Sequence, residues 1–231
     1  AFQQYDGYWT YYPYLASAIH AVFVAVFGLS LDTLRLASVF FGLILLVVTY
    51  IISSKLFGRR AGLIAFALLA TSAPFIFSSH MGRHDIIAAA FGYGAVALYI
   101  TNRRASISIS SILSGMLVGF ALDIHPNILI FVPVLLALHL CDYGWRAIRT
   151  GRFWGFALGG TLGVLFYVAM HILPYPQTFF ALGSLGNGAL RTPPILTPDL
   201  GLWRWSFSGT IDLLDFLLLP VSLPRVLKCI W

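Results

Sequence analysis

Long apolar runs separated by short polar stretches make up most of this chain. Six such runs follow one another: 36–54, 61–79, 86–101, 107–122, 128–141 and 153–173. A membrane-crossing helix needs about 20 apolar residues, and the runs that begin at residues 86, 107 and 128 are shorter than that. With a last apolar run at the C-terminal end, the pattern predicts an all-α integral membrane protein, a polytopic bundle of transmembrane helices.

A shorter apolar segment, 15–27, precedes these runs and follows a stretch rich in tyrosine and tryptophan. At about 13 residues it is too short to cross a bilayer, and such lengths are typical of interfacial or re-entrant helices. Amphipathic aromatic rings also favour the headgroup level of a bilayer. We therefore predict that residues 1–32 form an external juxtamembrane segment whose helix does not cross the membrane.

The composition supports a membrane protein, since 59% of the residues are hydrophobic and 10% are charged. So apolar a chain cannot hide its surface in one soluble core. The formal net charge of +6 would suggest a nucleic-acid partner for a soluble domain, but the basic residues lie in short clusters between apolar runs. That arrangement is typical of membrane topology, so we expect membrane lipid and no nucleic acid as a partner.

The basic clusters also predict the orientation, because basic residues concentrate on the cytoplasmic side. One cluster separates the first and second runs, one the third and fourth, and one the fifth and sixth, at 55–60, 103–104 and 146–152. Placing them in the cytoplasm predicts a single transmembrane domain over 1–231, incomplete, in the plasma (inner) membrane. Its parts are an external segment 1–32, six transmembrane helices within 33–173, an external loop 174–209 and a seventh transmembrane helix 210–231. The polar stretches 80–85 and 123–127 are then external loops.

Four prolines inside apolar runs are expected to kink their helices: Pro74, Pro133, Pro220 and Pro224. Proline lacks a backbone N–H and its ring crowds the preceding turn. Membrane bundles tolerate such kinks because neighbouring groups satisfy the freed carbonyls.

The stretch from His80 to Asp85 is the first candidate site, because charged residues between apolar runs are costly unless they lie at a membrane edge or in an aqueous pocket. Arg83 offers a planar fork of donors that suits a phosphate and keeps its charge. Asp85 could orient that arginine or contact an acceptor, while His80 and His84 could donate to phosphate or shuttle protons. The alternative is a local Arg83–Asp85 pair at an ordinary turn.

A second polar turn, 123–127, contains Asp123, His125 and Asn127. His125 and Asn127 are further candidates for substrate binding. The alternative is structural, because an asparagine just before an apolar run is also typical of a helix N-cap.

The histidines do not predict a metal site, since His80, His84 and His125 match no compact metal-binding motif. Three others lie on apolar runs and are expected to be packing residues: His20, His139 and His171.

Several short motifs together resemble a known family. In chain order they are Tyr12-Pro13-Tyr14-Leu15, Phe27-Gly28, Arg35, Leu56-Phe57-Gly58, Ala73-Pro74, Arg83-His84-Asp85 and His125-Pro126-Asn127. Their order and spacing, over most of residues 8 to 175, resemble the N-terminal half of GT-C membrane glycosyltransferases. The branch is the one that contains protein O-mannosyltransferases and the lipid A aminoarabinose transferase.

The resemblance implies transfer of a sugar from a polyprenyl-phosphate carrier to a protein, lipid or glycan acceptor, with no cofactor and no obligatory metal. The family's catalytic carboxylate lies well before the segment that matches Pro13, and Asp6 is too close to that proline to take its place. We therefore expect the catalytic residue upstream of Ala1, so that the chain is a fragment. The expected substrate-binding residues are Arg83, His84, Asp85, His125 and Asn127.

Two other classes of function remain open from the residues alone. A transporter or flippase for a lipid-linked or small anionic substrate would carry charged residues at mid-membrane depth and an inverted repeat, and neither is visible in the sequence. A membrane scaffold without catalytic activity is the other.

Overall fold

The computed structural model describes residues 14–102, 109–174 and 176, and its contacts group Tyr12–Met170 into one unit. The elements in chain order are α1 (Tyr14–Phe27), α2 (Leu31–Phe57), α3 (Arg59–Thr71), α4 (Ala73–His80), α5 (His84–Thr101), α6 (Ile109–Ile124), the 3-10 helix η1 (Pro126–Ile130), α7 (Phe131–Tyr143), the 3-10 helix η2 (Gly144–Arg149), α8 (Gly151–Tyr167) and the π-helix η3 (Val168–Ile172). Within the described ranges the chain is all-helical, which confirms the predicted fold class.

Membrane-crossing length is reached by four stretches of the described residues: Leu31–Phe57, His84–Thr101, Pro126–Arg149 and Gly151–Ile172. The bent pair α3 and α4 brings the number to five if the two helices form one span. Helix α6 is apolar but shorter, so six transmembrane helices within 33–173 stays a prediction. The predicted loop 174–209 and helix 210–231 lie outside the described residues, apart from Pro174 and residue 176.

Of the four prolines expected to kink their helices, Pro220 and Pro224 lie outside the described residues. Pro74 lies at the start of α4, and the axes of α3 and α4 meet at 62° at the break before it, so the predicted kink is confirmed. Pro133 lies in the first turn of α7, directly after η1, and the expected kink at this proline stays a prediction.

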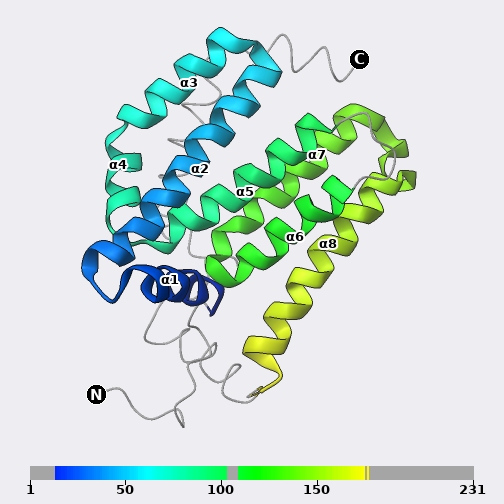
Figure 1. The fold of residues 1–231 in the computed structure, drawn as a ribbon. Helices are drawn as coiled ribbons and strands as arrows, with labels where there is room; N and C mark the ends of the chain where they lie inside the picture. The colour runs from blue at the N-terminus through cyan, green and yellow to red at the C-terminus, as the bar shows by residue number, and fades with distance from the viewer. Residues whose placement is uncertain (1–13, 103–108, 175, 177–231) are drawn as a thin grey trace, which may run out of the picture. The chain divides into compact units, whose positions relative to one another are not determined.

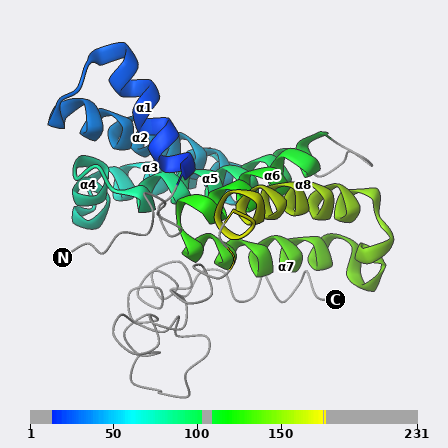
Figure 2. The ribbon, with the colours of Figure 1, turned by 90° about the horizontal axis from the view of Figure 1, so that it is seen from below.

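The helices alternate in direction, so the unit has two ends (Figure 1). The Arg83 end is where α2 and α5 begin and α6 finishes; the Arg152 end is where α3 and α8 begin and α5 finishes. Six basic residues of the described ranges gather at the Arg152 end, as the charge pattern predicted: Lys55, Arg59, Arg60, Arg146, Arg149 and Arg152. Helix α1 is at the Arg83 end and runs across the direction of its neighbours (Figures 1 and 2).

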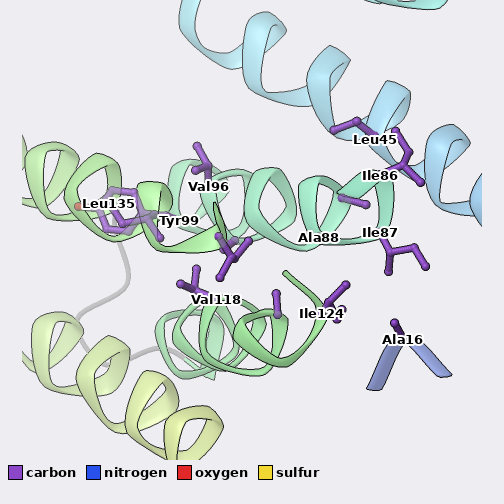
Figure 3. Packing of buried hydrophobic residues seen from close by; sticks show 14 of the residues in the cluster. Ala16, Leu45, Ile86, Ile87, Ala88, Val96, Tyr99, Val118, Ile124 and Leu135 are labelled. Carbon is purple, nitrogen blue, oxygen red and sulfur yellow. The ribbon is translucent and has the colours of Figure 1, made fainter. Parts of the chain in front are cut away.

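Helix α5 is the most enclosed of the four candidate spans, with 56% of its apolar window buried against 17–28% for the other three. It packs against α2 on one side and α6 on the other, and it also contacts α7. Figure 3 shows Ile86 and Ile87 at its start within the hydrophobic cluster, with Leu45 of α2 and Ala16 of α1 nearby. Because α5 begins directly after Arg83, its burial holds the first candidate site against the bundle.

Small residues allow α6 and α8 to pack more closely than any other pair of these helices. They recur at every fourth position, as Ser111, Gly115 and Gly119 on α6 and Gly155, Gly159 and Gly163 on α8. A side-chain carbon added at Gly159 would overlap the carbonyl oxygen of Ile112, and one at Gly115 would overlap that of Phe156. This contact of backbone on backbone is the small-xxx-small packing of membrane helices.

A buried polar network joins the last turn of α5 to α7 and α8. Arg152 is 1% exposed, donates from Nη2 to the carbonyl oxygen of Tyr99 at 3.0 Å, and lies 4.5 Å above the Tyr99 ring. The Tyr99 hydroxyl donates to Asp142 Oδ2 at 2.9 Å and lies 3.0 Å from His139 Nδ1. His139 Nε2 is in turn 2.7 Å from the Thr150 hydroxyl, so His139 is a packing residue with polar partners, as predicted. A buried charge needs such partners, because leaving it unpaired would be strongly destabilising.

Replacing Gly159 by alanine is expected to destabilise the protein, because the new methyl group must push α6 and α8 apart. Overpacking of this kind costs about 1–3 kcal/mol. The matched control is Gly160→Ala on the same turn, where the nearest atom to an added carbon, Gly115 O, is 3.9 Å away. Thermal unfolding in detergent should show a lower Tm for Gly159→Ala and no loss for Gly160→Ala; equal Tm values would contradict the proposed packing constraint.

Removing the Tyr99 hydroxyl is also expected to lower stability, because Asp142 and His139 lose a shared partner. Buried polar groups deprived of a partner cost about 1–3 kcal/mol. Tyr93→Phe is the control: Tyr93 lies on the same helix, and the described residues supply no hydrogen-bond partner for its hydroxyl. Tyr99→Phe should lower Tm while Tyr93→Phe leaves it unchanged, and the reverse order would refute the network's role.

Candidate functional site

The structure brings together residues from two polar turns at the Arg83 end. Arg83, His84 and Asp85 lie at the start of α5, and His125 lies between α6 and η1. The charges of Arg83 and Asp85 both act on His125, and His84 is within electrostatic range of Asp85 and His125. Four of the five residues expected to bind substrate therefore share one region.

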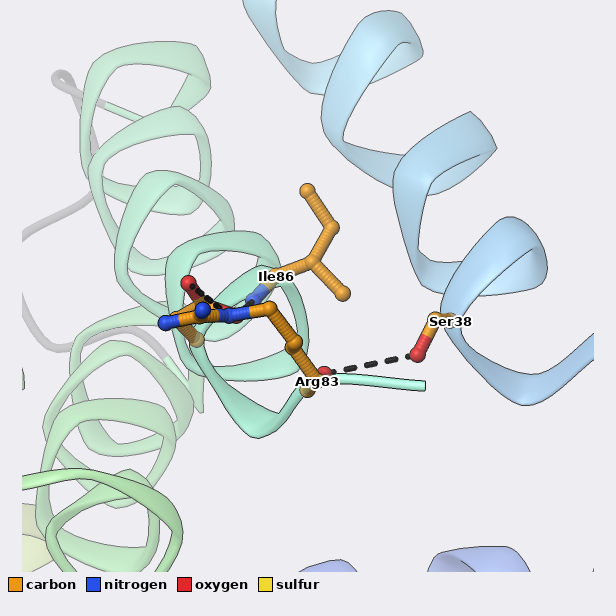
Figure 4. A network of polar contacts seen from close by, with 4 residues as sticks. Ser38, Arg83 and Ile86 are labelled. Carbon is orange, nitrogen blue, oxygen red and sulfur yellow. Dashed lines mark hydrogen bonds and ion pairs between the residues drawn. The ribbon is translucent and has the colours of Figure 1, made fainter. Parts of the chain in front are cut away.

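The turn before α5 is fixed by a glycine and by a contact from α2. Gly82 has a φ of +67°, in the left-handed region that favours glycine. The fully buried Ser38 donates its hydroxyl to the carbonyl oxygen of Arg83 at 3.3 Å (Figure 4). Because this bond engages the backbone of Arg83, the side chain is left to face outward.

The side chains of Arg83 and Asp85 form an ion pair, with Nε 3.0 Å from Oδ2. The other carboxylate oxygen of Asp85 accepts the backbone N–H of Ile86 at 3.1 Å. This is the local pairing that the sequence offered as an alternative. Such an exposed pair contributes little stability, here with side chains 55% and 35% exposed, so Arg83 can exchange its carboxylate for another anion at small cost.

His84 contacts a residue that the sequence had assigned to packing. Its ring lies edge-on to that of His20 on α1, with the centroids 5.5 Å apart. His20 is buried and donates from Nδ1 to the carbonyl oxygen of Ala16 at 2.7 Å. The Nδ1 atom of His84 is buried without a hydrogen-bond partner among the described residues. His20 thus belongs to the site as well as to the packing of α1, and no local sequence signal marks it.

His125, and not Asn127, caps the helix after the second polar turn. Its Nδ1 accepts the backbone N–H of Asn127 at 3.2 Å. Pro126 takes the first helical position, which proline favours, so the cap falls on the residue before it. The side chain of Asn127 is exposed and has no hydrogen-bond partner among the described residues, so its expected role in binding stays a prediction.

His80 does not join this group through any described hydrogen bond. Its Nδ1 lies 2.8 Å from the carbonyl oxygen of Ile76 and 3.1 Å from the Ser79 hydroxyl, both within α4. Across the described part of the chain, no three His, Cys, Asp or Glu side chains converge in a way that would hold a metal ion.

The pKa of His125 is lowered, chiefly because the ring is partly buried; Arg83 lowers it further and Asp85 partly offsets the effect. The neutral ring accepts at Nδ1 and so carries its proton on Nε2. At neutral pH the site then offers one permanent cation, Arg83, and a neutral imidazole donor. Placed at the end of an apolar bundle, these groups suit an anionic headgroup on an apolar tail.

Comparison with protein families gave a match that covers most of the chain. The family described as dolichyl-phosphate-mannose-protein mannosyltransferase matches residues 12–173, a range that contains both polar turns and all helices from α1 to α8. Searches of curated proteins and of solved structures gave no significant match.

The lowered pKa of His125 predicts a pH dependence of stability, because protonation of the partly buried ring is disfavoured and removes the acceptor at Nδ1 that caps the helix. Because the folded pKa lies below the ordinary value of about 6.5, the contribution of His125 is complete above pH 6.5 and is lost as pH falls toward the lowered value. His125→Asn retains a capping side chain that does not titrate. Thermal unfolding between pH 7.5 and 5.5 should show a steeper fall in Tm for the wild type than for His125→Asn; parallel curves would contradict the cap.

Proposed function

The chain belongs to the dolichyl-phosphate-mannose-protein mannosyltransferase family, whose members are glycosyltransferases that use a lipid-linked sugar, and from this premise we propose its specific reaction. The protein transfers a sugar from a polyprenyl-phosphate carrier to a protein, lipid or glycan acceptor on the external face of the membrane. Arg83, His84, Asp85, His125 and Asn127 bind the substrates.

The observation that carries this proposal is the gathering of Arg83, His84 and His125 at one end of an apolar bundle. A polyprenyl-phosphate sugar places its tail among lipid and its phosphate at the membrane edge. A permanent cation and imidazole donors at the ends of membrane helices lie where the phosphate would be, while the apolar helices lie where the tail would be.

In this reaction the bond from the anomeric carbon to the phosphate oxygen breaks, and a bond from that carbon to the acceptor oxygen or nitrogen forms. Arg83 exchanges Asp85 for the phosphate and stabilises the charge that develops on it. The Nε2 proton of His125 donates to a phosphate oxygen. Asp85 keeps Arg83 oriented between turnovers, because its second oxygen is fixed to the start of α5.

A general base must take the proton of the acceptor. We assign that role to none of the described residues: Asp123 is buried and accepts a backbone N–H of α1, and Asp85 is given the role of orienting Arg83. This is compatible with a catalytic carboxylate elsewhere in the full-length protein.

The external placement of the site rests on charge. Lys55, Arg59 and Arg60, with the basic residues around α8, lie at the opposite end from Arg83. Since basic residues favour the cytoplasmic side, the Arg83 end is external. A transporter would place charges at mid-depth, whereas the charged side chains of the described helices lie near helix ends.

Arg83→Ala is expected to lower kcat/KM for a polyprenyl-phosphate hexose by about 10- to 150-fold, the effect of losing a hydrogen bond to a charged group. The full-length protein in lipid nanodiscs would be assayed for release of polyprenyl phosphate. Arg83→Lys should recover part of the loss, because a lysine keeps the charge but not the planar fork.

The matched control is Arg149→Ala, which removes an exposed arginine from the opposite end of the bundle. Its activity should equal that of the wild type. Turnover by Arg83→Ala at the wild-type rate would refute the proposed phosphate contact, and a wild-type protein that releases no polyprenyl phosphate from any hexose donor would refute the function.

A further inference from the structure

The buried carboxylate of Asp123 connects two segments that are 108 residues apart in the chain. Asp123 lies in the last turn of α6, is 4% exposed, and accepts through Oδ2 the backbone N–H of Leu15 in the first turn of α1. The site described above does not use this contact.

The first turn of a helix has backbone N–H groups without partners in the helix itself, and the helix dipole favours negative charge there. A cap normally comes from the residue directly before the helix. Here a carboxylate from another helix supplies an acceptor, so it both stabilises the start of α1 and ties it to α6.

The packing of α1 is concentrated where Asp123 acts. Its buried residues, Ala16 and His20, both lie in its first half. Ala16 is fully buried near Ile87 of α5 and Ile124 of α6 (Figure 3). Later in the helix, Val26 is 68% exposed and Phe27 is 60% exposed. In this half no residue is fully buried, and the Phe23 ring packs on that of Phe40 of α2 with the centroids 5.8 Å apart, so the contact between α1 and α6 is confined to the first half of α1.

We propose that Asp123 is a positioning residue that docks α1 on the bundle and thereby holds His20 against His84 at the candidate site. The docking follows from the contacts of α1 alone. The consequence for turnover rests on the proposed function, since it requires that His84 and its neighbours bind the lipid-linked donor.

Hydrogen–deuterium exchange of the full-length protein in nanodiscs tests the docking. Asp123→Ala should raise exchange of the amides of residues 15–20 by about 2- to 30-fold, the range that corresponds to loss of an N-cap. Asp123→Asn keeps an acceptor oxygen and should give a smaller rise. Exchange in α8 should not change in either variant.

The matched control is Asp32→Ala. Asp32 also lies in the first turn of a helix at the Arg83 end, but its side chain is 92% exposed and contacts only Arg35 among the described charged residues. It should leave exchange in α1 and donor turnover at wild-type values.

A rescue experiment separates positioning from general destabilisation. The rings of Phe23 on α1 and Phe40 on α2 have centroids 5.8 Å apart, so cysteines at both positions can be joined by a short thiol cross-linker. These experiments use a protein in which Cys141 and Cys229 are replaced by serine. In it, Asp123→Ala should lower the rate of donor turnover by a factor similar to that by which it raises amide exchange in α1. Cross-linking Phe23→Cys to Phe40→Cys should restore both to within about twofold.

Unchanged exchange in α1 for Asp123→Ala would overturn the docking. Faster exchange with unchanged turnover, or no rescue by the cross-link, would overturn the link to the site. If the wild-type protein shows no transfer from a polyprenyl-phosphate hexose, the proposed function fails, while the exchange comparison still decides whether Asp123 docks α1.

Discussion

Burial of α5 on nearly every side is the constraint on which the rest of this fold depends. Between helices in lipid there is little hydrophobic gain, so close contact has to provide the attraction. Alanines and glycines along α5 allow that contact; at Gly92, for example, the missing side chain leaves room for the ring of Phe131 on α7. Because α5 cannot shift without repacking α2, α6 and α7, the residues at both of its ends are held in fixed positions.

The polar groups at one end of α5 are buried, and those at the other end are exposed. At one end Arg152 donates a hydrogen bond to Tyr99, and Tyr99 donates one to Asp142 on α7. These contacts are buried, which suits a role in stability. At the other end Arg83 is exposed and its one ion pair among the described residues is with Asp85, so the pair can open to a ligand at small cost. The same helix thus fixes a rigid network and presents an adaptable one, and the second is where we propose that the lipid-linked sugar binds.

Helix α1 differs from the others because it runs across their direction and packs on the ends of α2 and α6. It lies across the bundle, buries little beyond Ala16 and His20, and starts on the carboxylate of Asp123. An element that packs on the end of the bundle can reach the site without being part of the bundle's core. This explains how His20, on a helix too short to span a membrane, comes to lie against His84.

The sequence by itself determined the protein class, the alternation of the helices and the end of the bundle to which each polar turn belongs, because apolar runs and their breaks are local properties. It also placed Arg83 beside Asp85, since the two are neighbours in the chain. It misplaced the cap at the second turn, where Pro126 assigns that role to His125 and not to Asn127. The contacts of His20 with His84, of Asp123 with Leu15 and of Tyr99 with Arg152 were decided only by the tertiary structure. Which faces of two helices meet depends on how distant side chains fit together, and hydropathy along a single run carries no information about that fit.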